Sequence, residues 1–294
     1  MRVLLAYLTL VLMWSTTPLA IKWSGEGPGF LFGVTARMTI GLICVLILLA
    51  SMRLPLPCHR KALLNYLAVF LYLCPSMLAL YWASQFIPSG WLAVIFGLSP
   101  MITAILSAVW LGERSLKLRK LLAYGMGLAG LVLMFGTALN HSESAILGIV
   151  GVLVAALLQC TSTVAVKRIN SGLPALTQVG GGLLFSVPVF LIVWAVLDGC
   201  PPVGMPMASM ASIAYLGFIA TPLGFSLYFY VLKHLSATQV SLISLITPVM
   251  SLLVGHLSNH EAITTRLVAG TVLILSAVFF HEFEMAKWQR KPSG

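Results

Sequence analysis

Ten long apolar runs constrain this chain more than any other feature of its sequence. Each is close to the roughly 20 residues that an α-helix needs to cross a bilayer, whereas a membrane-spanning strand needs only about ten. In hydrocarbon, a helix also satisfies its backbone hydrogen bonds within one segment. The runs are Val3–Ile21, Phe30–Ser51, Leu63–Phe86, Trp91–Leu111, Leu121–Ala138, Ile146–Val166, Leu176–Leu197, Ala208–Leu232, Ala237–Leu257 and Leu267–Phe283. We therefore predict an all-α membrane protein with ten transmembrane helices.

The composition excludes a water-soluble globular protein. Of the 294 residues, 60 % are hydrophobic and only 8 % are charged, whereas soluble domains carry about 25 % charged residues. The net charge of +10 comes from basic residues in the short loops between the runs, which indicates contact with anionic lipid headgroups rather than with nucleic acid. A signal peptide is the weaker interpretation of the first run, because its apolar stretch continues beyond Trp14 to Ile21.

The basic residues also set the direction of insertion. If the N-terminus is cytoplasmic, the inner loops and ends hold fourteen of the 17 Lys and Arg residues. The outer loops then hold only Lys22 and Arg266, and Arg37 lies within the second run. Cytoplasmic loops are enriched in Lys and Arg. We therefore expect both termini to lie in the cytoplasm, on the inner side of a bacterial-type inner membrane.

The chain repeats short motifs at half its length. Four matches share an offset of 146 to 148 residues: Pro28 with Pro174, Leu80-Tyr81-Trp82 with Leu227-Tyr228-Phe229, Ser99-Pro100 with Thr247-Pro248, and Glu113 with Glu261. The constant offset indicates a duplication, with residues 1–140 and 141–294 as its two halves. Each half contains five predicted spans. Because five is an odd number, the second half starts on the opposite side of the membrane, and the two halves are inserted in opposite directions. Inverted repeats of this kind are typical of secondary transporters, whose substrate site lies near the midplane between the halves.

Several motifs resemble those of one transporter family. The first run reads Trp14-Ser15-Thr16-Thr17-Pro18 and ends near Lys22, the second contains Ala36-Arg37-Met38, and the fourth ends in Leu111-Gly112-Glu113. This pattern resembles the EamA-type transporters of the drug/metabolite transporter superfamily. The second half departs from the pattern, since Asn259-His260 precedes Glu261 and Gly180-Gly181-Gly182 lies near the position expected for an arginine.

The resemblance covers essentially the whole chain and implies both a fold and an activity. The implied fold is the ten-helix inverted repeat. The implied activity is the export of amino acids or similar small metabolites across the inner membrane, and inverted repeats achieve transport by alternating access. The expected partners are a small-molecule substrate and the lipid bilayer, a homodimer stays an open alternative, and no cofactor is expected.

Aromatic, amide and hydroxyl side chains inside the runs are the candidates for substrate binding. Trp14 and Thr17 share a helix face at i, i+3, and two further pairs do so at i, i+4. A cavity lined by aromatic rings with a few polar groups suits a small, partly apolar solute, although such residues also serve ordinary helix packing. The candidate set is Trp14, Thr17, Arg37, Tyr81, Gln85, Gln159, Thr163, Tyr228 and Gln239.

Arg37 is the one charged residue well inside a run. Its burial in a membrane costs roughly 3 kcal/mol on insertion scales, so the sequence predicts a partner for it. The partner is either the carboxylate of a substrate or, in a structural role, the carbonyls of neighbouring helices; the arginine also has the alternative of extending toward the interface. The residues alone leave these interpretations open.

Two equivalent prolines predict hinges. Pro100 and Pro248 lie inside the fourth and ninth runs, where a proline removes a backbone hydrogen bond and permits a kink. Because they occupy matching places in the two halves, we expect symmetric bending to open and close the substrate cavity.

Other functional classes are less well supported. No Asp or Glu lies in the middle of a run, which argues against a membrane-embedded metalloenzyme and against an exporter of multiple drugs or organic cations. His256 and His260 have metal-ligand spacing, but they lie at the interface, and the five cysteines form no CxxC motif. No metal site is therefore expected. A non-transporting scaffold is the remaining alternative, and the short loops offer it little surface.

Overall fold

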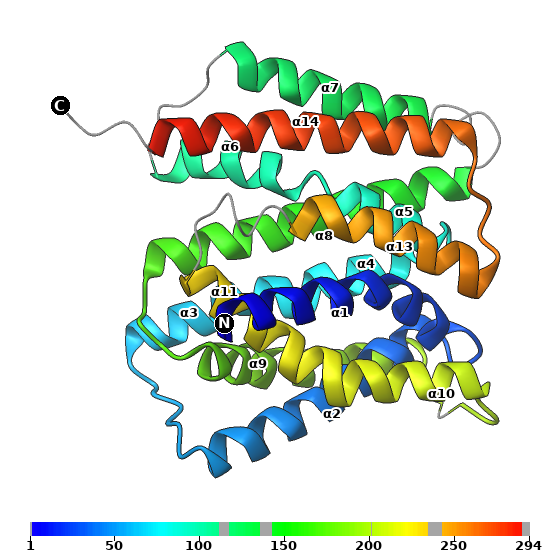
Figure 1. The fold of residues 1–294 in the computed structure, drawn as a ribbon. Coiled ribbons are helices and arrows are strands. Elements are labelled where there is room, and N and C mark those ends of the chain that lie inside the picture. Colours follow the sequence, from blue (N-terminus) through cyan, green and yellow to red (C-terminus); the bar gives the residue numbers. More distant parts are fainter. Residues whose placement is uncertain (1, 112–117, 136–142, 201, 235–242, 290–294) are drawn as a thin grey trace.

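The computed structural model describes residues 2–111, 118–135, 143–200, 202–234 and 243–289, and the regular structure in these ranges is helical (Figure 1). The first half contains α1 (Arg2–Gly25), α2 (Phe30–Ser51), α3 (Arg60–Leu71), η1 (Tyr72–Ser76), α4 (Met77–Ala83), α5 (Ser89–Phe96), α6 (Ser99–Leu111) and α7 (Leu118–Phe135). The second half contains α8 (Glu143–Ile169), α9 (Ala175–Leu197), α10 (Met207–Ala214), η3 (Tyr215–Gly224), α11 (Phe225–His234), α13 (Ile243–Asn259) and α14 (Thr265–Gln289).

Seven helical stretches in the described residues are long and apolar enough to cross a membrane. They correspond to predicted runs one to four and six to eight, with only small differences at their ends. The fifth, ninth and tenth runs form α7, α13 and α14, but the described parts of these helices do not meet the same criterion. The structure thus confirms the predicted helical architecture, and seven of the ten predicted runs form helices that are long and apolar enough to span a membrane.

The third and eighth spans each contain a π-helical segment around a proline. Pro75 lies in η1 and Pro222 lies in η3. A proline has no N–H to donate to the carbonyl of the preceding turn. Around each proline the backbone hydrogen bonds follow the i→i+5 pattern of a π-helix instead of the α-helical pattern. The two prolines are separated by 147 residues, the offset that also relates Tyr81 to Tyr228. Each π segment shifts the angular positions of the side chains that follow it.

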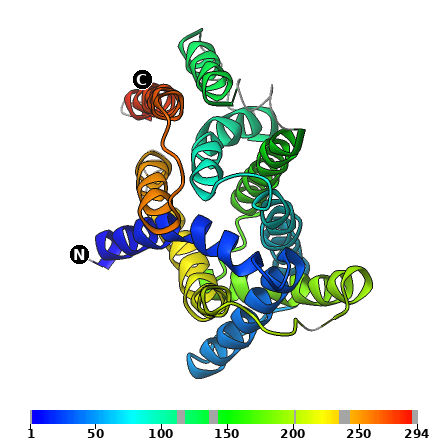
Figure 2. The ribbon, with the colours of Figure 1, turned by 90° about the vertical axis from the view of Figure 1, so that its right-hand side faces the viewer.

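The helices pack as a bundle with one pair set at its edge. α1 lies against α13 and α10, α2 lies against α9 and η3, and α3 lies against α8 and α9. α7 and α14 pack chiefly on one another, at the edge of the bundle opposite α2 (Figures 1 and 2). The close approach of this pair depends on Gly130, where an added Cβ would lie 2.9 Å from the carbonyl oxygen of Gly270.

Three consecutive glycines bring α9 close to two helices of the first half. A Cβ on Gly180 would meet Leu49 of α2, and Cβ atoms on Gly181 and Gly182 would meet Tyr66 and Val69 of α3. These glycines occupy the place where the family pattern suggested an arginine. In this chain they serve close helix packing instead.

We expect Gly181→Ala to destabilise the fold. Its methyl group would overlap the ring of Tyr66, which is buried, and overpacking of this kind costs about 1 to 3 kcal/mol. Thermal unfolding of the purified protein should show a lower midpoint. Gly125→Ala on α7 is the matched control, because no atom of a neighbouring element lies within 4 Å of its added Cβ among the described residues; an equal effect of both substitutions would contradict the packing argument.

A hydrogen-bonded network joins three helices at the predicted outer end of the bundle. The carboxylate of Glu261, in the loop between α13 and α14, accepts bonds from the backbone N–H groups of Ser89 (2.8 Å) and Gly90 (3.1 Å) at the start of α5. Asn259 donates to the same carboxylate at 3.2 Å. Asn259 also accepts a bond from the indole N–H of Trp23 on α1, at 3.2 Å. Glu261 therefore caps α5 and neutralises its positive end.

This capping changes the acidity of Glu261. Burial alone would raise the pKa of its carboxyl group, but the bonds from Ser89, Gly90 and Asn259 outweigh burial and lower the pKa below the ordinary value. A carboxyl group with a lowered pKa stabilises the folded state fully above its unfolded pKa, about 4.3. That stabilisation is lost as the pH falls through the lower folded value.

We therefore expect the stability of the protein to fall below about pH 4, and Glu261→Gln to reduce that dependence. At neutral pH the variant should also lose about 1 kcal/mol, a usual cost of removing a helix cap. Thermal unfolding measured between pH 3 and 7 tests both points, with Glu26→Gln, an exposed carboxylate at the same end, as the control. Parallel pH profiles for wild type and Glu261→Gln would contradict the assignment.

Candidate functional site

Arg37 of α2 is almost fully buried, with 2 % of its surface exposed. Its Nε donates to Thr221 Oγ1 at 3.0 Å, and one terminal nitrogen donates to the Tyr81 hydroxyl at 3.4 Å. Its Cζ atom also lies 6.0 Å from the ring centre of Phe225, within the range of a cation–π contact. In the part of the chain that the structure describes, these neutral groups are its bonded neighbours, and no carboxylate forms an ion pair with it.

The guanidinium group therefore keeps hydrogen-bonding capacity. It has five N–H donors, and the two bonds to Thr221 and Tyr81 use two of them. A permanent cation in a low-dielectric interior attracts an anion strongly. The arrangement suits a carboxylate that enters from outside the protein.

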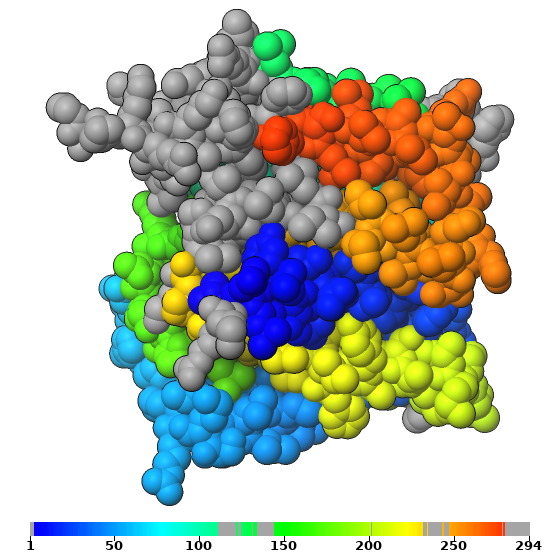
Figure 3. All heavy atoms as spheres, in the orientation of Figure 1, coloured from blue at the N-terminus to red at the C-terminus, as the bar shows by residue number. Residues whose placement is uncertain are grey.

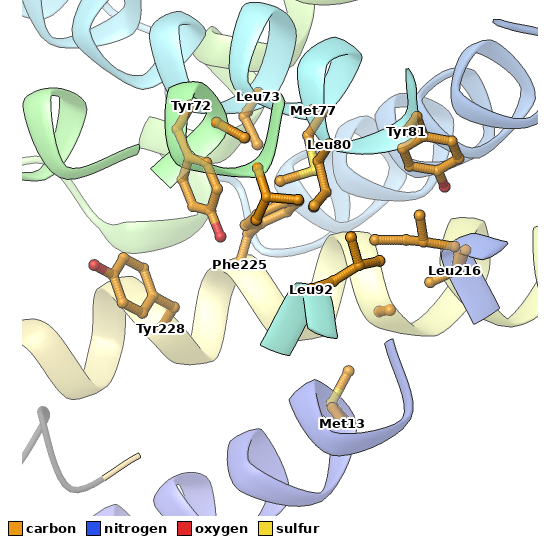
Figure 4. Close-up of a cluster of buried hydrophobic side chains, with 14 of the residues drawn as sticks. Met13, Tyr72, Leu73, Met77, Leu80, Tyr81, Leu92, Leu216, Phe225 and Tyr228 are labelled. Atoms are coloured by element: carbon orange, nitrogen blue, oxygen red, sulfur yellow. The ribbon is translucent and has the colours of Figure 1, made fainter. Parts of the chain in front are cut away.

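Four aromatic rings continue from Arg37 toward α1; we call Trp14, Tyr72, Phe225 and Tyr228 the aromatic cluster. The ring centres of Phe225 and Tyr72 are 5.1 Å apart, those of Tyr72 and Tyr228 are 6.3 Å apart, and those of Tyr228 and Trp14 are 5.2 Å apart. Figure 4 shows Tyr72 pointing from its helix toward Phe225 and Tyr228 on the facing helix. Such contacts add to the stabilisation from buried area.

The π-helical segments lie at the centre of this site. Tyr72 is the first residue of η1, and Thr221 lies in η3 directly before Pro222. Phe225 begins the α-helix that follows η3. One partner of Arg37, Thr221, and part of the aromatic cluster, Tyr72, thus come from the two places where the backbone departs from regular α-helix, as is frequent at functional sites.

Five of the predicted substrate-binding residues are brought together. Arg37 bonds to Tyr81, Trp14 packs on Tyr228, and the Tyr228 hydroxyl lies 3.2 Å from Thr163 Oγ1. These residues come from five different spans. A sixth, Gln159, is buried one turn from Thr163 on α8, and its carbonyl accepts a bond from Thr163 at 2.9 Å.

Three predicted residues are not placed with them. Thr17 is half-buried, and its hydroxyl bonds to the Met13 carbonyl of its own helix at 2.6 Å. Gln85 does not share a helix face with Tyr81, because α4 ends at Ala83 and Gln85 lies exposed in the following turn. Its amide bonds to the Trp82 carbonyl at 3.2 Å. Gln239, like Glu113 of the family motif, lies outside the described residues.

Three residues of the site were not predicted from the sequence: Tyr72, Thr221 and Phe225. The shared offset of Pro75 and Pro222 was the available signal for them. Asn65 lies on α3, seven residues before Tyr72, and is fully buried. Neither atom of its amide has a hydrogen-bond partner within the described residues. Because an unsatisfied buried polar group costs about 1 to 3 kcal/mol, a polar group or a water molecule bound to Asn65 would stabilise the fold.

The two predicted hinge prolines have different surroundings. The fourth span is interrupted at Gly97 and Leu98, and Pro100 lies in the first turn of α6 that follows. Pro248 lies inside α13, which is continuous from Ile243 to Asn259. The two halves therefore differ at equivalent positions, with a turn in the first and an unbroken helix in the second.

The described residues contain no group of three or more His, Cys, Asp or Glu side chains that could hold a metal ion. His256 contributes instead to the outer network, since its Nδ1 lies 2.9 Å from the carbonyl oxygen of Glu261. The site is thus an uncharged aromatic and hydroxyl surface around one buried guanidinium. It offers recognition rather than a reactive group.

Comparison with known proteins agrees with a transport role. The model of the EamA-like transporter family matches residues 1–136 and again residues 146–281. The uncharacterized transporter YoaV of Bacillus subtilis is 26 % identical, over 97 % of this chain and 98 % of that protein. A probable amino-acid metabolite efflux pump of Escherichia coli is 26 % identical, over 69 % of this chain and 70 % of the pump.

A solved crystal structure shares the fold. It has a TM-score of 0.70 and 20 % sequence identity, and the match covers 96 % of this chain and 98 % of the other. The family model covers most of the chain in its two segments, and the related proteins carry the names of transporters rather than enzymes. This chain is a membrane protein that belongs to the EamA-like transporter family.

Proposed function

We propose that this protein exports an amino acid or a closely related small metabolite across the inner membrane, with both termini in the cytoplasm. The observation that carries the proposal is the buried guanidinium of Arg37, which faces neutral partners at one end of the aromatic cluster. Homologues named as probable amino-acid metabolite efflux pumps in Escherichia coli and Salmonella typhimurium support the same class of substrate.

The geometry divides recognition between two regions. A substrate carboxylate would bind to Arg37 and the hydroxyl of Tyr81, in a charge-assisted contact of the strong kind. The apolar part of the substrate would lie on the aromatic cluster, whose rings start next to Arg37 at Phe225. An organic cation would meet the positive charge of Arg37 without a compensating carboxylate, and for this reason we favour an amino-acid-like substrate over organic cations.

We further propose that the two halves form an inverted repeat. The pattern of neighbouring helices supports it: α1 packs on α13 and α10, and the equivalent α8 packs on α6 and α3. Likewise, α2 packs on η3, and the equivalent α9 packs on η1. The double match to one family model and the paired π segments around Pro75 and Pro222 add independent support.

The difference between the two halves supports alternating access. In an inverted repeat, the two halves of one state hold different conformations, and exchanging them produces the opposite state. The turn at Gly97 and Leu98, opposite an unbroken α13, is a difference of this kind. The bonds from Ser89 and Gly90 to Glu261 meanwhile hold α5 to the second half at the predicted outer end.

Counterflow in proteoliposomes tests the substrate class. Vesicles loaded with unlabelled amino acids should accumulate the labelled counterpart, and Arg37→Gln should reduce this uptake at least tenfold, which corresponds to about 1.4 kcal/mol of lost binding. Arg37→Lys keeps the charge but not the bonding geometry and should give an intermediate rate. Arg266→Gln, an exposed basic residue, is the control. Uptake of amines without a carboxylate, or full activity of Arg37→Gln, would reject the proposal.

The same assay tests the hinges. Replacing Pro100 by Ala supplies the N–H that would bond to the carbonyl of Phe96, so it should straighten the turn at Gly97 and Leu98. We expect Pro100→Ala to slow counterflow by favouring one access state. Pro248→Ala, which removes the equivalent hinge in the second half, should also slow counterflow. Wild-type rates in both variants, from protein of normal thermal stability, would show that neither proline is a hinge.

A further inference from the structure

A groove of about 540 Å³ lies on the surface between α1, α10 and α13. Its floor and walls include Leu12, Thr16 and Trp23 of α1, together with Ala211 and Tyr215 from the eighth span. Leu12 is 62 % exposed, so the groove opens to the surroundings and not into the interior of the bundle. Figure 3 shows the face of the molecule on which these three helices meet.

The chemistry of the groove is that of hydrocarbon. None of the described residues that line it is charged. Two of its hydroxyl groups, those of Thr16 and Tyr215, bond to each other at 2.7 Å, and Thr16 also donates to the Met13 carbonyl at 3.0 Å. A polar solute would therefore find few free hydrogen-bond partners here to replace those it has in water. An alkyl chain makes no hydrogen bonds, so it would lose none on binding.

The length and the ends of the groove match one leaflet of a bilayer. From Leu12 to Trp23 the helix rises about 16 Å, and one leaflet contributes about 15 Å of hydrocarbon. At the Trp23 end, the indole N–H bonds to Asn259, and Ser258 completes the lining. Trp and polar side chains of this kind lie at the level of lipid headgroups.

We propose that this groove is a binding site for one acyl chain of a phospholipid, with the headgroup at the Trp23 and Asn259 end. With the predicted orientation of the chain, the lipid belongs to the outer leaflet. An acyl chain bound in this groove contacts three helices at once, whereas a lipid on a convex part of the surface contacts fewer. It would brace α1, α10 and α13 against one another, next to the outer network that Trp23 joins.

The groove lies next to the π segment η3. Met13 lines the groove, and its Cε also lies 3.4 Å from the position of an added Cβ on Gly224, the last residue of η3. Figure 4 places Met13 on the α1 side of the buried cluster. The acyl-chain site is nevertheless separate from the proposed transport function, since it needs neither Arg37 nor the aromatic cluster.

Photo-crosslinking tests the site directly. The protein is reconstituted in phosphatidylethanolamine and phosphatidylglycerol vesicles that contain a phosphatidylethanolamine with a diazirine in its acyl chain, and adducts are located by peptide mass spectrometry. Adducts at residues 12–23 and 208–215 should saturate at a low mole fraction of the probe. Adducts at the exposed residues Val196 and Leu197 of α9 should instead rise in proportion to the probe.

A matched pair of variants gives the second readout. Ala211→Trp fills the groove and should reduce groove adducts at least fivefold, whereas Ala214→Trp, on the same helix and exposed but outside the lining, should leave them unchanged. In the wild-type protein, groove adducts that rise in proportion to the probe, as the α9 adducts do, would by themselves overturn the proposal. Groove labelling that persists in a stably folded Ala211→Trp would overturn it as well.

Discussion

A permanent positive charge in the interior of a membrane protein is the interaction to which the rest of this structure is adapted. Arg37 is buried between spans of both halves, and the desolvation of its guanidinium has to be offset where it lies. Thr221 and Tyr81 provide hydroxyl groups, and Phe225 provides the face of an aromatic ring. These groups stabilise the charge without neutralising it, so the site retains an attraction for anions.

Two residues next to Arg37 and in the aromatic cluster come from helices that depart from regular geometry. Thr221 and Tyr72 both lie in π-helical segments next to a proline. In a regular helix, the residues before and after such a segment would point in other directions, and the row of rings from Phe225 to Trp14 would not form. The irregular backbone is therefore part of the proposed recognition surface, and it can persist inside a membrane because it is enclosed by protein.

The sequence allowed much of this arrangement to be predicted. Apolar run length located the seven helices that are long enough to span a membrane, and the pairing of Tyr81 with Tyr228 pointed to two residues that lie in the site. Arg37 was identifiable because a charge inside a run stands out. Tyr72, Thr221 and Phe225 were missed because ordinary helical spacing does not reveal a widened turn. Gln85 was misplaced because the apolar run continues to Phe86, whereas the helix itself ends at Ala83 before Pro88.

The cap on α5 has a consequence for how the protein is assembled. Glu261 belongs to the second half of the chain, but the N–H groups that it binds belong to the first, and α7 finds its main packing partner in α14. In a polypeptide that carries only the first half, the start of α5 would lack the carboxylate of Glu261, and α7 would lack its packing partner α14. The packing of the first half is therefore completed by residues of the second half, and these contacts can form only after the chain from Glu261 through α14 has been synthesised.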